Sequence, residues 1–227
     1  MHRMLLKRFD FAEFARPLFS DRVAMAWADP REPMQRLIGD EELALGAVNT
    51  ARAREFAAGR AAARQAMAQL GHAPRPVLQG ESLAPVWPAG LTGSITHAPQ
   101  DTVAVVTDDP EIRALGLKIS DTHLLPYTRW ADICTMAELR WLGTLGPSQR
   151  GHFAGLLECI KIAITKASFQ AVAAMPGWHE IEVAVDLGTN HFRVQLHAAE
   201  DQFELPNDLS GRFALLSQAY IAGVVWR

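Results

Sequence analysis

The chain has 227 residues, of which 49% are hydrophobic, and its mean hydropathy of +0.01 is typical of a globular protein. A formal net charge of -3 and an isoelectric point near 6.2 exclude the overall basic excess with which proteins neutralise a nucleic-acid backbone. No run of about 18 apolar residues occurs, so we expect no membrane-spanning helix.

The N-terminal segment and the cysteine count both point to the cytoplasm. Asp10 and Glu13 interrupt the stretch after the basic N-terminus, so the apolar core of a signal peptide does not develop. Cys134 and Cys159 are too few for a disulfide framework or a four-ligand zinc site. We therefore expect a cytoplasmic protein with reduced thiols, no nucleic-acid partner and no membrane partner.

The first helix of the chain is predicted over residues 52–70. Before it, the first forty residues mix prolines with short apolar stretches, which predicts a strand and loops. Asn49 or Thr50 can cap the helix, no proline interrupts it, and Gly71 can adopt the left-handed conformation that ends it.

Two strands are predicted near the middle of the chain. Prolines and glycines crowd residues 72–93, which predicts an extended, turning connection. The valine-rich run 102–107 predicts a strand, and residues 115–120 predict a second one. Because turn residues separate the two runs, we expect them to pair in one sheet.

A short helix, a long helix and four strands are predicted in the second half. The short helix covers residues 131–142, and Ser148 can cap the long one. Apolar residues three and four apart define the buried face of the long helix: Phe153, Leu157, Ile160, Ile164 and Ala167. The strands cover residues 181–187, 191–197, 212–218 and 219–226.

Helices and strands thus separate twice into a long helix with an antiparallel sheet. This order predicts an α+β fold rather than a parallel, doubly wound sheet. We expect two similar halves, each a small antiparallel sheet with a packed long helix, over residues 1–112 and 113–227.

Six segments spread over most of the chain form an ordered set of motifs: residues 54–64, 80–81, 85–88, 93–97, 116–120 and 159–166. Together they resemble the motifs of the 4'-phosphopantetheinyl transferases, in the branch that loads carrier proteins of siderophore, peptide and polyketide synthesis. The resemblance implies two α+β halves with a coenzyme A site between them. It also implies coenzyme A, or a phosphopantetheine arm, as ligand and an acyl or peptidyl carrier protein as partner.

The chain departs from the family where the metal is bound. In the family, an acidic pair on a G-I-D-[IV]-E strand and a glutamate in a W-x-x-K-E-[AS]-x-x-K helix hold magnesium against the coenzyme A pyrophosphate. Here Lys118, Ser120 and Ile162 stand at those positions. They lack the hard oxygen ligands that magnesium requires, so we expect a divergent member without a metal. The Lys118 ammonium can act beside a phosphate or an oxyanion instead, or it can pair with Asp121.

A cysteine and a histidine suggest a different chemistry for this site. The resemblance places Cys159 toward the vacated metal position, and His97 resembles the coenzyme-contacting histidine of the family. A thiol beside an imidazole or a cation is a nucleophile. The hypothesis is a catalytic set of Cys159, His97 and Lys118 that accepts an acyl group, with His123 as the alternative base. The alternative is that Cys159 only packs as a small apolar residue.

Further positions match coenzyme-contacting residues of the family. Arg60 and Arg64 lie four apart on one helical face, and guanidinium groups suit phosphate. The cofactor-binding set that the resemblance implies is Arg60, Arg64, Thr96, His97, Lys161 and Lys166.

Three functions are compatible with these residues. The first is a repurposed enzyme of specialised metabolism that transfers the acyl group of a carrier-protein or coenzyme A thioester through Cys159. It would form an amide or an ester with a small-molecule acceptor and use no metal. The second is a magnesium-dependent 4'-phosphopantetheinyl transferase acting on acyl or peptidyl carrier proteins. The third is a non-catalytic protein that binds a carrier protein.

Overall fold

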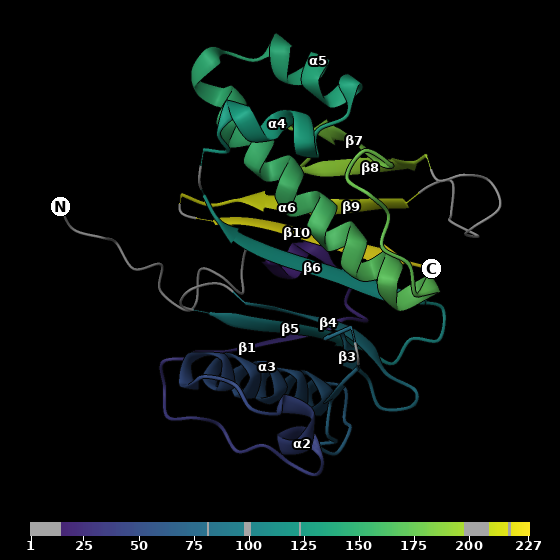
Figure 1. Ribbon diagram of the computed structural model, residues 1–227. Coiled ribbons are helices and arrows are strands. Elements are labelled where there is room, and N and C mark those ends of the chain that lie inside the picture. The colour runs from purple at the N-terminus through teal and green to yellow at the C-terminus, as the bar shows by residue number, and fades with distance from the viewer. Residues whose placement is uncertain (1–14, 81, 98–100, 123, 198–208, 218) are drawn as a thin grey trace.

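The described residues fold into two larger sheets, each with a long helix against it, and a small two-stranded sheet (Figure 1). This computed structural model describes residues 15–80, 82–97, 101–122, 124–197, 209–217 and 219–227. Within these ranges, no helix combines the length and the apolar character needed to cross a membrane.

The N-terminal half is a three-stranded antiparallel sheet in the order β1-β5-β4, covered by the helix α3 (Thr50–Gln69). The Asn49 side chain accepts a hydrogen bond from the Arg52 amide at the start of α3, and Gly71 follows its end with a φ of 83°. The other elements are η1 (Arg16–Leu18), β1 (Ala24–Ala28), α2 (Glu41–Leu45), β2 (Leu78–Gln79), β3 (Pro85–Val86), β4 (Thr92–His97) and β5 (Thr102–Thr107).

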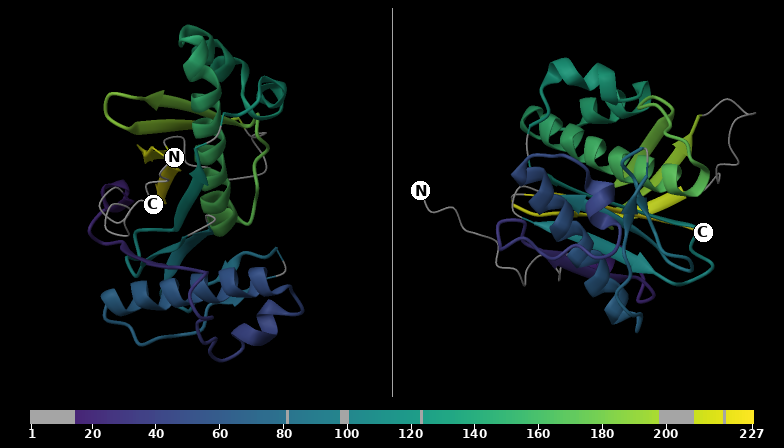
Figure 2. Two further views of the ribbon diagram at one scale, coloured as in Figure 1. Left: turned by 90° about the vertical axis from the view of Figure 1, so that its left-hand side faces the viewer. Right: turned by 60° about the horizontal axis from the view of Figure 1, so that its bottom comes forward.

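The C-terminal half is a five-stranded antiparallel sheet in the order β6-β10-β9-β8-β7, covered by the long helix α6 (Pro147–Val172). Figure 2 shows that α3 and α6 run in different directions, one against each sheet. The other elements are β6 (Ala114–Asp121), α4 (Tyr127–Ile133), α5 (Met136–Thr144), β7 (Ile181–Asp186), β8 (His191–Leu196), β9 (Leu209–Leu215) and β10 (Ala219–Trp226).

The predicted α+β class is confirmed, whereas three local predictions are wrong. The N-cap of α6 is Gly146 rather than Ser148, which lies inside the helix. β5 and β6 do not pair: β5 lies between β1 and β4, and β6 pairs with β10. The helix predicted over 131–142 is two helices, because Thr135 caps α5 through a capping box with Glu138 and so separates it from α4. The division between residues 112 and 113 stays a prediction.

Three hydrophobic clusters hold the layers together. One lies between α6 and the five-stranded sheet, and another lies between α3 and the three-stranded sheet. The third lies between the two sheets, where Val103 and Val105 of β5 meet Leu115, Leu117 and Ile119 of β6. Both faces of β5 are therefore buried, which explains its continuous run of apolar residues.

The edge strands β4 and β6 lie side by side, and side chains rather than a backbone ladder join them. The Ser94 hydroxyl accepts from the Leu117 amide at 3.1 Å, and the Thr96 hydroxyl accepts from the Ile119 amide at 3.2 Å. Lys166 and Gln170 of α6 complete this β4–β6 seam by binding backbone groups of both strands. The side chains thus satisfy edge groups that a sheet would otherwise leave open.

Candidate functional site

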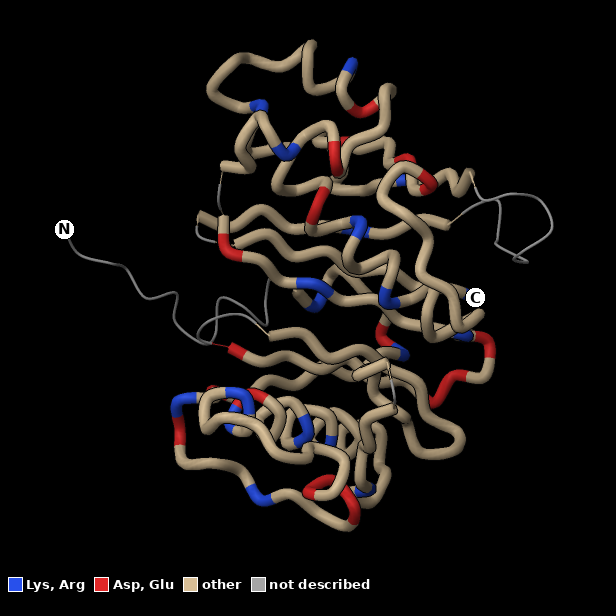
Figure 3. Tube along the Cα trace, viewed as in Figure 1, with Lys and Arg blue, Asp and Glu red and all other residues tan. Residues whose placement is uncertain are grey.

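A pocket of about 700 Å³ lies beside the β4–β6 seam. Its lining comes from both halves: α3, the β2–β3 hairpin and β4 on one side, and β6 and α6 on the other. Five of its residues are cationic or imidazole side chains: Arg52, Arg60, His97, Arg113 and Lys166. No Asp or Glu among the described residues lines it. Figure 3 marks Lys and Arg positions in blue on α3 and on α6, the helices that contribute three of these side chains.

Arg60 is buried at the pocket wall with only 5% of its surface exposed. Its Nε donates to the Val77 carbonyl at 2.7 Å and its Nη2 donates to the Leu78 carbonyl at 2.9 Å. The guanidinium carbon lies 3.9 Å from the centre of the Phe56 ring. Burial lowers the pKa of Arg60 to about 10, so the group stays charged at neutral pH. It forms no ion pair with a described residue.

Lys166 lies in both the seam and the pocket lining. Its ammonium donates to the carbonyl of Ile95 on β4 and, at 3.0 Å, to that of Leu117 on β6. An ammonium has three donors, so one remains for a ligand. Burial, and then the nearby charge of Lys118, lower the pKa of Lys166 to about 7.

His97 lies at the end of β4 and faces the pocket from the side of α3. Its Nδ1 is 3.1 Å from the Thr102 hydroxyl, and Gly59 leaves room for its ring, since a Cβ there would lie 3.1 Å from His97 Cε1. Burial, followed by the charge of Lys166 and other cations, lowers the pKa of His97 to about 3. The imidazole is therefore neutral, and it can donate or accept one hydrogen bond to a ligand.

The residues at the family's magnesium positions do not fit a magnesium ion. Strand alternation places Lys118 and Ser120 on the face of β6 that meets α6, and Ser120 lies beside the Cys159 thiol. Ile162 of α6 is a hydrocarbon. A cation, a hydroxyl and an alkyl group offer none of the carboxylate oxygens that magnesium needs. Within the described parts of the chain, no three His, Cys, Asp or Glu side chains are grouped to hold a metal elsewhere.

Cys159 is not placed as the nucleophile that the cysteine hypothesis requires. Its side chain has no exposed surface, and its Sγ points to the sheet, 3.6 Å from the Lys118 carbonyl and 3.8 Å from the Tyr220 carbonyl. Burial raises the pKa of Cys159 to about 12, so the thiolate is absent at neutral pH. Its phase on α6 thus directs the sulfur into the core, as the packing alternative supposes.

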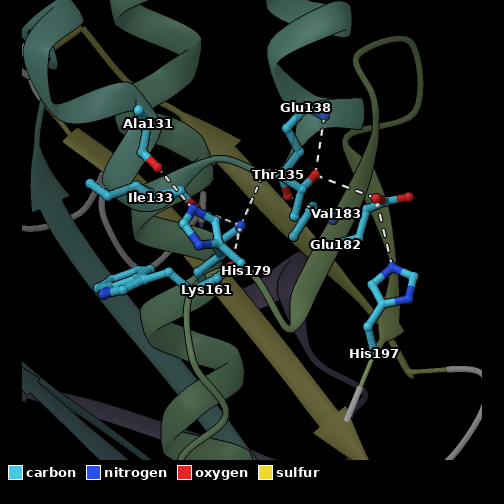
Figure 4. Close-up of polar contacts among 10 residues, drawn as sticks. Ala131, Ile133, Thr135, Glu138, Lys161, His179, Glu182, Val183 and His197 are labelled. Atoms are coloured by element: carbon cyan, nitrogen blue, oxygen red, sulfur yellow. Dashed lines mark hydrogen bonds and ion pairs between the residues drawn. The ribbon is translucent and has the colours of Figure 1, made fainter. Parts of the chain in front are cut away.

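Lys161 is also turned away from the pocket, into the core on the far side of α6. Its fully buried ammonium lies 2.8 Å from Glu138 Oε2 and donates to the carbonyls of Ile133 and Trp178 at 2.8 and 2.7 Å (Figure 4). Glu138 in turn accepts from the amides of Thr135 and Val183. With all three donors used, Lys161 has none for a cofactor; it joins α6 to α5 and β7.

Thr96 and Arg64 also have structural partners in place of a ligand. The Thr96 hydroxyl belongs to the seam and is buried. Arg64 holds the buried carboxylate of Glu41 at 2.7 and 2.8 Å and the Arg36 carbonyl at 2.7 Å, which ties α3 to α2. Neither residue lines the pocket. His123, the alternative base, lies outside the described residues.

The sequence motifs did not predict two of the pocket residues, Arg52 and Arg113. Arg52 is in the first turn of α3, where it also pairs with Glu55 at 3.4 Å, and Arg113 directly precedes β6. Neither falls on a motif residue, and only the approach of the two halves brings them to one pocket. The only sequence feature that could have indicated them is their position beside the motif segments, near the starts of α3 and β6.

The geometry agrees with comparisons to known proteins. The family model of the 4'-phosphopantetheinyl transferase N-terminal domain matches residues 40–107. The chain is 30% identical over 168 residues to 4'-phosphopantetheinyl transferase Svp of Streptomyces mobaraensis, which covers 74% of this chain and 68% of that protein. It is 32% identical over 136 residues to 4'-phosphopantetheinyl transferase Npt of Nocardia iowensis, covering 60% of each chain.

A third relative gives the same result. 4'-Phosphopantetheinyl transferase PptT of Mycobacterium tuberculosis is 32% identical over 147 residues, which are 64% of each chain. The matched regions therefore span between 60% and 68% of the relatives' own lengths. With the pocket between two α+β halves and the motifs along the chain, these matches show that the protein belongs to the 4'-phosphopantetheinyl transferase superfamily.

Proposed function

We propose that this protein binds coenzyme A in the pocket beside the β4–β6 seam and transfers its 4'-phosphopantetheine arm to a carrier protein. The observation that carries the proposal is the unpaired charge of Arg60 and Lys166. Among the described residues, both groups donate hydrogen bonds only to backbone carbonyls, and neither forms an ion pair with a carboxylate. Buried charge without a counter-charge is costly, and a phosphate-rich ligand would supply both the charge and the acceptors.

The remainder of the pocket suits the apolar parts of the same ligand. Trp87 and Phe169 contribute aromatic surface, and the Trp87 indole nitrogen is buried without an acceptor among the described residues. At the rim, Leu83 and Met175 are exposed apolar side chains. Pockets for cofactors usually combine such apolar walls with a few polar groups in volumes of about 300 to 1,000 Å³.

In the proposed transfer, a hydroxyl of the carrier protein attacks the phosphorus atom that bears the pantetheine arm. The diphosphate P–O bond breaks, 3',5'-ADP leaves with the bonding electrons, and the hydroxyl proton passes to solvent water. Arg60 and Lys166 would hold the phosphates and stabilise the charge that develops on their oxygens. Lys118, Ser120 and Ile162 do not fit magnesium, so Arg60 and Lys166 would supply positive charge in this transfer without that ion. Acyl transfer through Cys159 has no support, since its thiol is buried.

The test is to incubate the protein with coenzyme A and an apo carrier protein and to measure the intact mass of the carrier. A gain of one phosphopantetheine arm, lost in Lys166→Met, is expected. The matched control is Arg193→Ala, because Arg193 is an exposed cation on β8, three strands away from β6 in the sheet order. An unmodified carrier with every apo carrier tried would overturn transfer.

A second candidate is binding without transfer, and the altered magnesium positions favour it. A protein that keeps the cationic pocket but loses the metal ligands can hold coenzyme A or a carrier-bound arm and leave it unchanged. The same experiment separates the two candidates. Binding of coenzyme A by titration calorimetry together with an unmodified carrier would establish the second.

A further inference from the structure

We propose that the Lys118 ammonium takes the electrostatic place of a divalent ion, so that this protein binds the diphosphate of coenzyme A without any metal. This inference rests on the proposed coenzyme A site and defines how that site holds its most charged group.

Lys118 lies on β6 next to the seam. The backbone amides of its neighbours Leu117 and Ile119 donate to the hydroxyls of Ser94 and Thr96. The Leu117 carbonyl also accepts a hydrogen bond from Lys166. By strand alternation the Lys118 side chain is on the same face as Gly116, and that face packs directly on α6: a Cβ at Gly116 would lie 2.1 Å from the Ala163 carbonyl. The Lys118 side chain therefore lies on the α6 face of β6, next to the pocket but not among the residues that line it.

The Lys118 ammonium forms no ion pair with a carboxylate of the described residues. The side chain is half-buried, yet it makes no ion pair or hydrogen bond with any residue that the structure describes. Lys166, on the facing helix, has carbonyl partners but no carboxylate. The charge of Lys118 contributes to the depressed pKa values of both Lys166 and His97, so the three groups share one region of positive potential.

Two neighbouring cations repel each other and also repel a third. A divalent cation would enter this region against both ammonium groups and would find no carboxylate at positions 118, 120 or 162. A diphosphate carries the opposite charge, and it would relieve the repulsion while accepting hydrogen bonds from both lysines. The arrangement therefore favours the anion alone over a metal–anion pair.

Titration calorimetry of coenzyme A into the full chain tests this, once with excess EDTA and once with excess magnesium chloride. We expect dissociation constants within about twofold of each other in the two buffers, and weakening of about tenfold or more in Lys118→Met, since the variant loses a charge-assisted contact with the diphosphate. Arg193→Ala, which removes the same charge from the far side of the sheet, is the matched control and should bind as the wild type does.

A triple variant, Lys118→Asp with Ser120→Glu and Ile162→Glu, provides the reverse experiment. It should bind coenzyme A weakly in EDTA and regain affinity with magnesium. Thermal unfolding of each variant verifies that it is folded; Lys118→Arg, which keeps the charge, should retain most of the affinity.

Binding of coenzyme A by the wild type that strengthens tenfold or more with magnesium would overturn the inference and leave the proposed site intact. Equal binding by Lys118→Met and wild type would overturn it as well. Absence of binding in both buffers would instead overturn the proposed coenzyme A site itself.

Discussion

Lys161 and Glu138 form an ion pair at 2.8 Å in which neither side chain is exposed to solvent by more than 1%. The pair also binds backbone groups of four residues, and so it fixes α6 against α5, β7 and the segment before β7. The lysine that matches a family motif thus organises the core on one side of α6 rather than the pocket on the other.

Replacing Lys161 with Met should lower the free energy of unfolding by about 3 to 5 kcal/mol, because Glu138 would remain as a buried, unpaired charge. Urea denaturation measures the change. Arg129→Met, which breaks the exposed Arg129–Asp132 pair, is the control and should change stability by less than about 1 kcal/mol. A Lys161→Met protein of normal stability that has lost coenzyme A binding would contradict the structural role.

Thr96→Val should destabilise the protein by about 1 to 3 kcal/mol, since the Ile119 amide would lose its acceptor in the seam. Valine keeps the volume of threonine, so packing changes little. Because Thr96 does not line the pocket, its coenzyme A affinity should stay within about twofold of the wild type, which is about 0.4 kcal/mol. A stable variant with much weaker binding would show instead that the hydroxyl contacts the ligand.

Both cysteines should resist alkylation in the folded protein. Burial raises the pKa of Cys134 and of Cys159 to about 12, so neither forms a thiolate at neutral pH. Iodoacetamide labelling followed by mass spectrometry should modify them only after denaturation. Cys159→Ala should keep coenzyme A binding and any transfer activity; loss of turnover with intact binding and folding would revive the cysteine mechanism.

The affinity for coenzyme A should rise as the pH falls from about 9 to about 7, through Lys166. Burial and Lys118 lower its pKa from 10.5 to about 7, and a bound phosphate would favour the ammonium again, so binding takes up a proton. His97, with a pKa near 3, stays neutral in this range, and the buried Cys159 stays protonated.

Calorimetry in two buffers of different ionisation enthalpy measures that proton uptake. Lys166→Arg, which stays charged throughout, is the control and reports any protons taken up by the ligand phosphates, whose second pKa is about 6. Equal proton uptake by the two proteins would exclude Lys166 as the titrating group.

The lowered pKa of Lys166 also makes the stability of the unliganded protein depend on pH. Between about pH 7 and about pH 10.5 the unfolded chain holds the Lys166 proton more tightly than the folded chain. Lys166 therefore makes the free energy of unfolding decrease as the pH falls from about 10.5 to about 7. Below about pH 7 its contribution no longer changes with pH. Lys166→Met should flatten this part of the profile in denaturation experiments; an unchanged slope would contradict the depressed pKa.

The sequence predicted the elements better than their partners. The apolar run of β5 and the spacing of apolar residues in α6 gave both elements within a few residues of their bounds. The predicted pairing of β5 with β6 was wrong. The sequence of a strand that is buried on both faces does not indicate which strands lie beside it. The actual partners, β1 for β5 and β10 for β6, are far from them in the chain.

The site residues were also predicted only in part. The motifs identified Arg60, His97 and Lys166, which line the pocket, but they also implicated Lys161 and Thr96, which do not. Helical spacing shows which residues share a face of a helix, but it does not show which face is turned toward a ligand. The direction of each side chain was set by contacts with distant segments, such as that of Lys161 with Glu138.

The binding of coenzyme A in the seam pocket is decided by a calorimetric titration of the wild type beside Lys166→Met. We expect saturable one-to-one binding to the wild type, and binding weaker by about tenfold or more, equivalent to about 1.4 kcal/mol, for the variant. If folded wild type binds no coenzyme A, or if both proteins bind it equally well, the unpaired cations beside the β4–β6 seam do not form its site.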